Sequence, residues 1–184
     1  MDGIRLMVEE HVYIKRMLKV LRKASYGVMQ GGNIDYADFG KMIDFVRNYA
    51  DRHHHGKEEK LLFNRMVDEI GGAAEKLVKS GMLVEHDLGR LHMKELEEAL
   101  ERVKGGDEES KLDVIANAIS YTHLLNRHID KEDAVVYPFA QRQLSAETME
   151  TINSECESFE KQMESEGVQD RYIALLEEME IKYL

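Results

Sequence analysis

The sequence predicts an all-α protein, an antiparallel up-down-up-down four-helix bundle with additional C-terminal helices. Proline occurs only once among the 184 residues, far below its usual share of about 5%, and proline is the residue that most strongly disfavours a helix interior. Good helix formers, chiefly Glu, Lys, Leu, Met and Ala, dominate the composition. Pairs of glycines divide the chain into long segments with short joints, and short joints favour antiparallel neighbours in a bundle.

The first helix is expected over residues 2–29, because its apolar residues recur with the 3.6-residue period of an amphipathic helix. Asp35 is a suitable N-cap for the second helix. Gly81 is expected to separate a short helical piece from the long helix that follows it. Pro138 should kink or reset the last helix of the bundle near its end. The helices after the first are expected over residues 35–70, 73–79, 82–104 and 108–144.

Residues 1–144 are expected to form the bundle, and residues 145–184 a helical extension that packs on it. Ser145 is a suitable N-cap for a fifth helix, and Gly167 separates this helix from a sixth. The extension mixes apolar with acidic residues, which suits helices that cover the bundle or contact a partner, whether another protein or a second copy of the chain. No low-complexity segment or linker marks a further domain.

Composition also limits the classes of partner and the expected location. The 36 acidic residues outnumber the 25 basic ones, giving a net charge of −11, which argues against nucleic acid or an anionic membrane as the main partner. The single cysteine, Cys156, excludes an internal disulfide framework and a cysteine-rich metal site. No apolar run approaches the ~18 residues of a membrane-spanning helix, and the first residues lack the pattern of a secretory signal. A cytoplasmic protein is therefore expected.

The His and Glu residues that could form a functional site lie in an internal repeat. Residues 54–63 (HHGKEEKLLF) align without gaps with residues 128–137 (HIDKEDAVVY), and both follow the pattern His-x-x-Lys-Glu-acid-x-aliphatic-aliphatic-aromatic. In the same way Glu10-His11 in the first helix matches Glu85-His86 in the third. The chain therefore consists of two similar helical hairpins, each with one single His and one His-x-x-x-Glu pair.

The His-x-x-x-Glu spacing places both side chains on one face of a helix, about 6 Å apart. His54 and Glu58 can therefore face a common centre, and so can His128 and Glu132. In a bundle these faces converge in the core, where a carboxylate without a partner would be costly. Four imidazoles and two carboxylates in an apolar interior suit two divalent transition-metal ions.

The helix face selects His54 from three adjacent histidines. His54 shares its face with apolar residues upstream and with Glu58 downstream. His55 is expected to face water, because polar and charged residues precede it on its own face. His53 is followed four residues later by Lys57, which cannot bind a metal. The sequence thus predicts no metal role for four histidines: His53, His55, His92 and His123.

These residues resemble the hemerythrin-like family, the His/Glu cation-binding (HHE) four-helix domains, over roughly residues 1–144. The resemblance rests on the ordered set of a first-helix His, a His-x-x-x-Glu pair, a third-helix His and a second such pair. It implies a non-haem di-iron centre with bridging carboxylates, so two iron ions are the expected cofactors, with zinc or another divalent metal as the alternative. The metal ligands that it implies are His11, His54, Glu58, His86, His128 and Glu132.

Two positions bear on the comparison with the oxygen carriers of that family. The carriers have a second His four residues after the third-helix His, where this chain has Arg90. One protein ligand fewer leaves an additional open position on one iron, and an inward-facing Arg90 would stabilise an anionic species bound there. Asp133 also fits the carrier spacing, but the repeat favours Glu132, which aligns with Glu58.

Three functions follow as expectations. The first is a protein that binds, senses or scavenges a small diatomic ligand, oxygen or nitric oxide, or that handles iron. The alternative is a di-iron enzyme with oxidase, peroxidase or nitric oxide reductase-like activity, or one of iron-centre repair under nitrosative stress, the branch of the family that a set of four His and two Glu resembles. The third is a structural module with zinc or no metal. Glu10 and Glu85 could accept hydrogen bonds from ligand imidazoles, although surface positions are expected for both.

Overall fold

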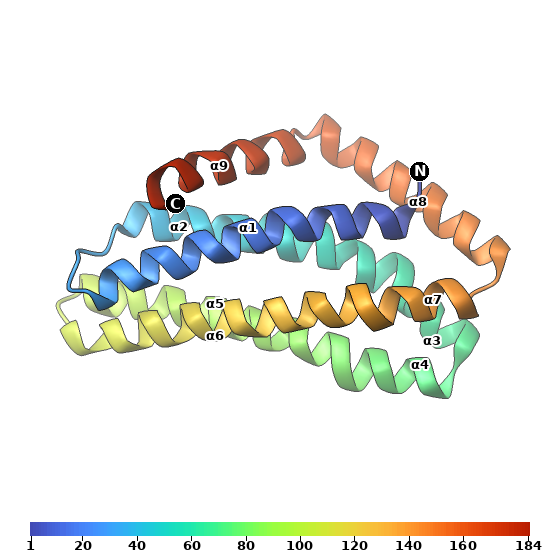
Figure 1. Ribbon diagram of the computed structural model, residues 1–184, viewed down its shortest axis with the longest axis horizontal. Helices are drawn as coiled ribbons and strands as arrows, with labels where there is room; N and C mark the ends of the chain where they lie inside the picture. The colour runs from blue at the N-terminus through green and yellow to red at the C-terminus, as the bar shows by residue number, and fades with distance from the viewer.

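Four long helical columns, each antiparallel to the next along the chain, form the body of the computed structural model, which describes residues 1–184 (Figure 1). The first column is α1 (Gly3–Met29), whose N-cap Asp2 accepts a hydrogen bond from the backbone of Arg5 at 3.1 Å. Asp35 caps α2 in the same way by accepting from the backbone of Asp38. There is no strand, so the predicted all-α class is confirmed.

Each of the other three columns joins several helical segments. The second column runs through α2 (Tyr36–Phe45), η1 (Val46–His55), η2 (Glu58–Phe63) and α3 (Asn64–Ile70). The third runs through α4 (Gly72–Leu77), η3 (Val78–Met82) and α5 (Leu83–Lys104). After a 3₁₀ turn, η4 (Glu108–Ser110), the fourth runs through α6 (Lys111–Lys131), η5 (Glu132–Val136) and α7 (Tyr137–Gln143). Two further helices follow, α8 (Ala146–Ser165) and α9 (Val168–Tyr183). None of the helices has both the length and the apolar character needed to cross a bilayer.

The segments η1, η2, η3 and η5 are π-helical, with backbone hydrogen bonds that span one residue more than those of an α-helix. The predicted break at Gly81 is absent, because η3 carries the helix through this glycine into α5. At Pro138 the chain also stays helical. The proline lies in the first turn of α7, directly after η5, where its missing N–H is best tolerated.

A polar layer divides the apolar core into two clusters. One cluster fills the end of the bundle near the α1–α2 joint, and the other fills the end near α3, α4 and α7. On α1, His11 lies between Met7 of the second cluster and Ile14 of the first. The other three columns pass from one cluster to the other at the same level, so the polar layer crosses the whole bundle.

The helices α8 and α9 lie across the outer side of α1 and the second column (Figure 1). The Gly3 backbone N–H donates to Asn153 Oδ1 on α8 at 2.8 Å, and a Cβ on Gly3 would lie 2.8 Å from Cys156 Sγ. This glycine therefore permits the close approach of α1 and α8. Gly167, with φ of 69°, makes the turn between α8 and α9. The division of the chain at residue 144 into two parts stays a prediction.

Candidate metal centre

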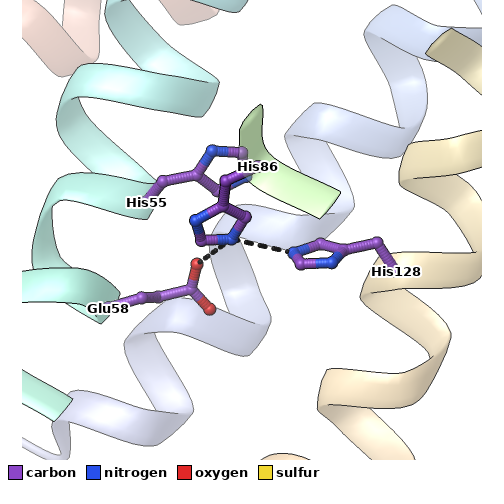
Figure 2. Close-up of side chains that lie close together, drawn as sticks. All are labelled: His55, Glu58, His86 and His128. Atoms are coloured by element: carbon purple, nitrogen blue, oxygen red, sulfur yellow. Dashed lines mark hydrogen bonds and ion pairs between the residues drawn. The ribbon is translucent and has the colours of Figure 1, made fainter. Parts of the chain in front are cut away.

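Buried histidine and glutamate side chains make up the polar layer. Their potential ligand atoms form three groups, in each of which the atoms lie within 4.8 Å of one another, and two of these groups share Glu58. The first position is the group of His11, His54, Glu58 and Glu132. The second position is the group of His55, Glu58, His86 and His128. Figure 2 shows the second position, in which the His86 imidazole lies between Glu58 and His128.

Glu58 belongs to both positions. Its side chain is fully buried, and Oε2 lies 3.6 Å from the Nε2 atoms of both His54 and His86. The Tyr137 hydroxyl donates a hydrogen bond to the other oxygen, Oε1, and lies 3.4 Å from His11 Nε2. Glu58 can therefore bridge two ions while Tyr137 holds the other side of its carboxylate.

Glu132 reaches both positions from the fourth column. Its Oε1 lies 2.9 Å from His128 Nε2, and its Oε2 lies 3.4 Å from His11 Nε2. The neighbouring Asp133 is only half-buried, and its Oδ1 lies 2.7 Å from His11 Nδ1. The structure thus places Glu132 among the candidate ligands and Asp133 behind one of them.

An outer carboxylate orients each of the five imidazoles. A carboxylate only accepts hydrogen bonds, so each imidazole donates from Nδ1, which leaves the Nε2 lone pair for a metal. The Nδ1–oxygen distances are 2.7 Å for His11 to Asp133, 2.7 Å for His86 to Glu59, 2.8 Å for His54 to Glu10, 2.9 Å for His128 to Glu85 and 3.2 Å for His55 to Asp51.

The internal repeat accounts for four of these five pairs. Glu10 and Glu85 are equivalent, and each orients the His of the His-x-x-x-Glu pair in its own hairpin. Glu59 and Asp133 are also equivalent, and each orients the single His of the other hairpin. The expected surface position is wrong for Glu10, which is buried. The repeat therefore builds an outer shell of acids as well as the inner groups.

Burial and neighbouring charges set the protonation of the metal-free centre. Burial and the charge of Glu132 raise the pKa of Glu58. Burial also acts to raise the pKa of Glu132, but the imidazolium of His128 holds it well below its usual range. For His128, burial acts to lower the pKa, whereas Glu132 raises it to about 10. Burial lowers the pKa of His54 to about 4. Without a metal, these shifts favour a positive charge on His128, whose Nε2 lies 2.9 Å from Oε1 of the negatively charged Glu132.

Three carboxylate oxygens in the layer have no hydrogen-bond donor, namely Glu58 Oε2 and both oxygens of Glu132. Burying such groups without partners is unfavourable. Imidazole nitrogens and carboxylate oxygens are the donor types that iron, zinc and other divalent transition metals accept. The residues present therefore fit a centre of two metal ions, because cations at the two positions would neutralise these oxygens.

His55 is a candidate ligand that the sequence analysis missed, and the prediction that it faces water is wrong. It is buried together with His53 and His54, and its ring stacks on that of His86 with centroids 3.8 Å apart. These histidines lie in η1, and a π-helix has more residues per turn than the 3.6 assumed in the face analysis. The run of three histidines could have indicated this, but the repeat has Ile129 at the equivalent position and so concealed it.

Arg90 contacts neither position. Its side chain is 40% exposed and pairs with Asp51 and Glu59, each at 2.7 Å, which are the outer carboxylates of His55 and His86. Arg90 also lines a cavity of about 110 Å³ whose wall includes His55 and His86. The inward orientation considered for Arg90 is therefore not observed, and its guanidinium is bonded to the outer acids instead.

The remaining histidines lie outside both positions. His92 bonds to Asn117 at 3.1 Å, and His123 is exposed. His53 belongs to a third group of potential ligands with Glu10 and Glu160. The Lys57 ammonium contacts both acids of this group, so a lysine already supplies the positive charge there.

Comparison with known families adds one finding to this geometry. The family described as the hemerythrin HHE cation binding domain matches residues 2–140 of the chain. No curated protein matches it. All of the candidate ligands at both positions lie within the matched residues.

Proposed function

Since the chain belongs to the hemerythrin HHE cation-binding domain family, we propose that it is a non-haem di-iron protein that binds a small diatomic molecule, oxygen or nitric oxide. The observation that carries this proposal is the pair of ligand groups joined by Glu58 and Glu132, which supplies donors for two ions rather than one. Iron suits a mixture of imidazole and carboxylate donors, and zinc at the same positions is the alternative that metal analysis decides.

The two positions differ in their number of imidazoles. The first has two, from His11 and His54, and the second has three, from His55, His86 and His128. Bound iron would supply open coordination positions for the diatomic molecule, and fewer protein donors leave more of them open. This inequality favours the first position as the place where such a molecule binds.

The surrounding residues support binding of a small, uncharged molecule. The Tyr137 ring stacks on His11 with centroids 5.6 Å apart, and its hydroxyl faces the first position. The cavity of about 110 Å³ beside His55 and His86 makes the second position the alternative place for such a molecule. Arg90 acts there through Glu59 and Asp51, since its charge is already paired with these two acids.

Metal content and ligand binding test the proposal. Protein produced with iron and purified without chelators should contain two iron ions per chain. After anaerobic reduction, mixing with oxygen or nitric oxide should change its optical spectrum. Glu58→Gln should reduce the iron content to one ion or fewer, because both positions lose a charged donor. The matched control is Glu98→Gln on α5, an exposed acid that pairs only with Lys94 at 3.7 Å. Full zinc occupancy, or two iron ions in the Glu58 variant, would contradict the proposal.

The same mixing experiment separates binding from catalysis. A stable adduct that returns to the reduced spectrum when the gas is removed indicates a binding or sensing protein. Release of a reduced product over repeated cycles indicates instead a di-iron enzyme, including one of iron-centre repair.

A further inference from the structure

Lys57 is a fully buried cation near the first position, and one of its partners comes from a C-terminal helix. Its ammonium contacts Glu10 on α1 and Glu160 on α8. It also lies 3.3 Å from His53 Nε2 and 5.6 Å from the centre of the Phe159 ring, at cation–π distance. Two acids, an imidazole and an aromatic ring thus hold this lysine in one place.

Glu10 links Lys57 to a candidate metal ligand, His54. Its Oε1 accepts from Lys57, and its Oε2 accepts from His54 Nδ1 at 2.8 Å. Because Glu10 is only 4% exposed, the loss of one of its partners is unfavourable. A continuous chain of contacts therefore leads from Glu160 on α8 to the His54 imidazole.

The second hairpin provides an internal comparison. Lys131 is the repeat equivalent of Lys57, and its ammonium contacts Glu85, which accepts from His128 Nδ1 at 2.9 Å. Here, however, the lysine side chain is 48% exposed, and Glu85 is its ion-pair partner. The same Lys–Glu–His arrangement thus occurs in both hairpins. In the first hairpin its lysine is buried and contacts α8, and in the second its lysine is exposed and does not.

We propose that Lys57 and Glu160 are positioning residues through which α8 holds His54 and so slows the loss of the ion from the first position. This inference rests on the proposed metal centre. An outer partner of a metal-binding His typically changes metal affinity by about 10–100-fold. Solvent screens the exposed Lys131 pair more strongly than the Lys57 pairs, because the Lys57 side chain is fully buried. By linkage, ion binding and the docking of α8 stabilise each other by the same factor.

The test uses Glu160→Gln in the full-length, iron-loaded protein. This change removes the charge but keeps the shape and one acceptor oxygen. When iron is released to excess chelator, one of the two release phases should accelerate about tenfold, the lower end of the range for a direct outer partner, because Glu160 acts through Lys57 and Glu10. The control is Glu157→Gln, one turn earlier on α8, which pairs at the surface with Lys161 and with the N-terminal ammonium, contacts neither Lys57 nor Glu10, and should change neither phase. Lys131→Met should accelerate the other phase by less than about fivefold.

Hydrogen exchange in α8 distinguishes positioning from a general loss of stability. In the wild type, iron loading should increase the protection of α8. In Glu160→Gln this increase should disappear, while protection without iron should stay the same, because Ile152 and Cys156 still anchor α8 in the core. Equal release rates in wild type and variant, or iron-dependent protection retained in the variant, would overturn the inference. A wild-type protein that takes up no iron would refute the proposed function itself, and metal analysis reads that result separately.

Discussion

At the scale of single residues, the candidate centre depends on which nitrogen of each imidazole is free. Outer carboxylates occupy Nδ1 in all five, so every Nε2 is available toward the centre. This arrangement fixes each ring orientation and directs each Nε2 toward the centre before a metal arrives, and His128 must still lose its proton. Ion binding therefore requires loss of protons but little movement of side chains.

His55 supplies the sharpest test of the ligand set. His55→Phe keeps a ring that can stack on His86 but removes both nitrogens. Since even the loss of an outer partner costs about 10–100-fold in affinity, affinity for the second ion should fall by at least this much. Titration with metal, followed by measurement of the ions retained per chain, checks the prediction. His92→Phe is the control, because His92 bonds to Asn117 away from the centre. Unchanged affinity in the His55 variant would make His55 a stacking partner only.

The sequence predicted the inner residues that the repeat duplicates. His54 and Glu58 come together with their equivalents His128 and Glu132 because a four-residue spacing holds on both columns. Their role as ligands stays a prediction. His55 could not be found in this way, because it has no equivalent in the second hairpin.

At the scale of the helix, the π-helical segments explain what periodicity missed. A hydrophobic pattern with a period of 3.6 identifies where a long helix lies, and it located the four columns. It carries no information about a local change to wider turns, which depends on tertiary packing. Three of the four π-helical segments, η1, η2 and η5, include or begin at candidate ligands, namely His54, His55, Glu58 and Glu132. The unpredicted backbone feature therefore coincides with the site.

The docking of α9 should depend on apolar burial more than on its ion pairs. Leu176 is fully buried within the larger cluster, so Leu176→Ala should lower the free energy of unfolding by about 2–5 kcal/mol. Glu180 makes two hydrogen bonds to Arg16, at 2.9 and 2.6 Å, but both side chains are partly exposed. Glu180→Gln should therefore cost less than about 1 kcal/mol. Urea denaturation of both variants measures the two values, and the reverse order would show that the ion pair dominates.

At the scale of the whole molecule, the C-terminal helices connect the two halves of a divided core. Ile152 and Cys156 on α8 join the cluster near α3, whereas Tyr172 and Leu176 on α9 join the other cluster. The polar layer lies between them, and apolar contacts cannot stabilise it. The bundle therefore needs a cation, or protons in its place, to neutralise the buried carboxylates of this layer.

Removing the metal should lower the Tm, and the difference in Tm between metal-loaded and metal-free protein should become smaller as the pH falls. Ion binding adds about 2.7 kcal/mol to the free energy of unfolding when the free ion exceeds its Kd by about 100-fold. Acid weakens ion binding, because the ligands must lose their protons before they bind a metal. In the metal-free protein, Glu132 raises the pKa of His128 to about 10 although burial acts against it. The stabilisation from this pair is fully present below the unfolded pKa of about 6.5 and is lost as the pH rises through the folded value. Both effects make the difference in Tm between metal-loaded and metal-free protein smaller at about pH 6.5 than at about pH 9.

Calorimetric melting of iron-loaded and chelator-treated protein at the two pH values measures this difference. In Glu132→Gln it should be small at both, because the variant lacks the charge that holds either the ions or the His128 proton. Glu98→Gln should behave as the wild type, since it leaves the polar layer intact. If the metal-free wild type melted at the same temperature as the loaded protein at the higher pH, bound cations could not be what stabilises the polar layer.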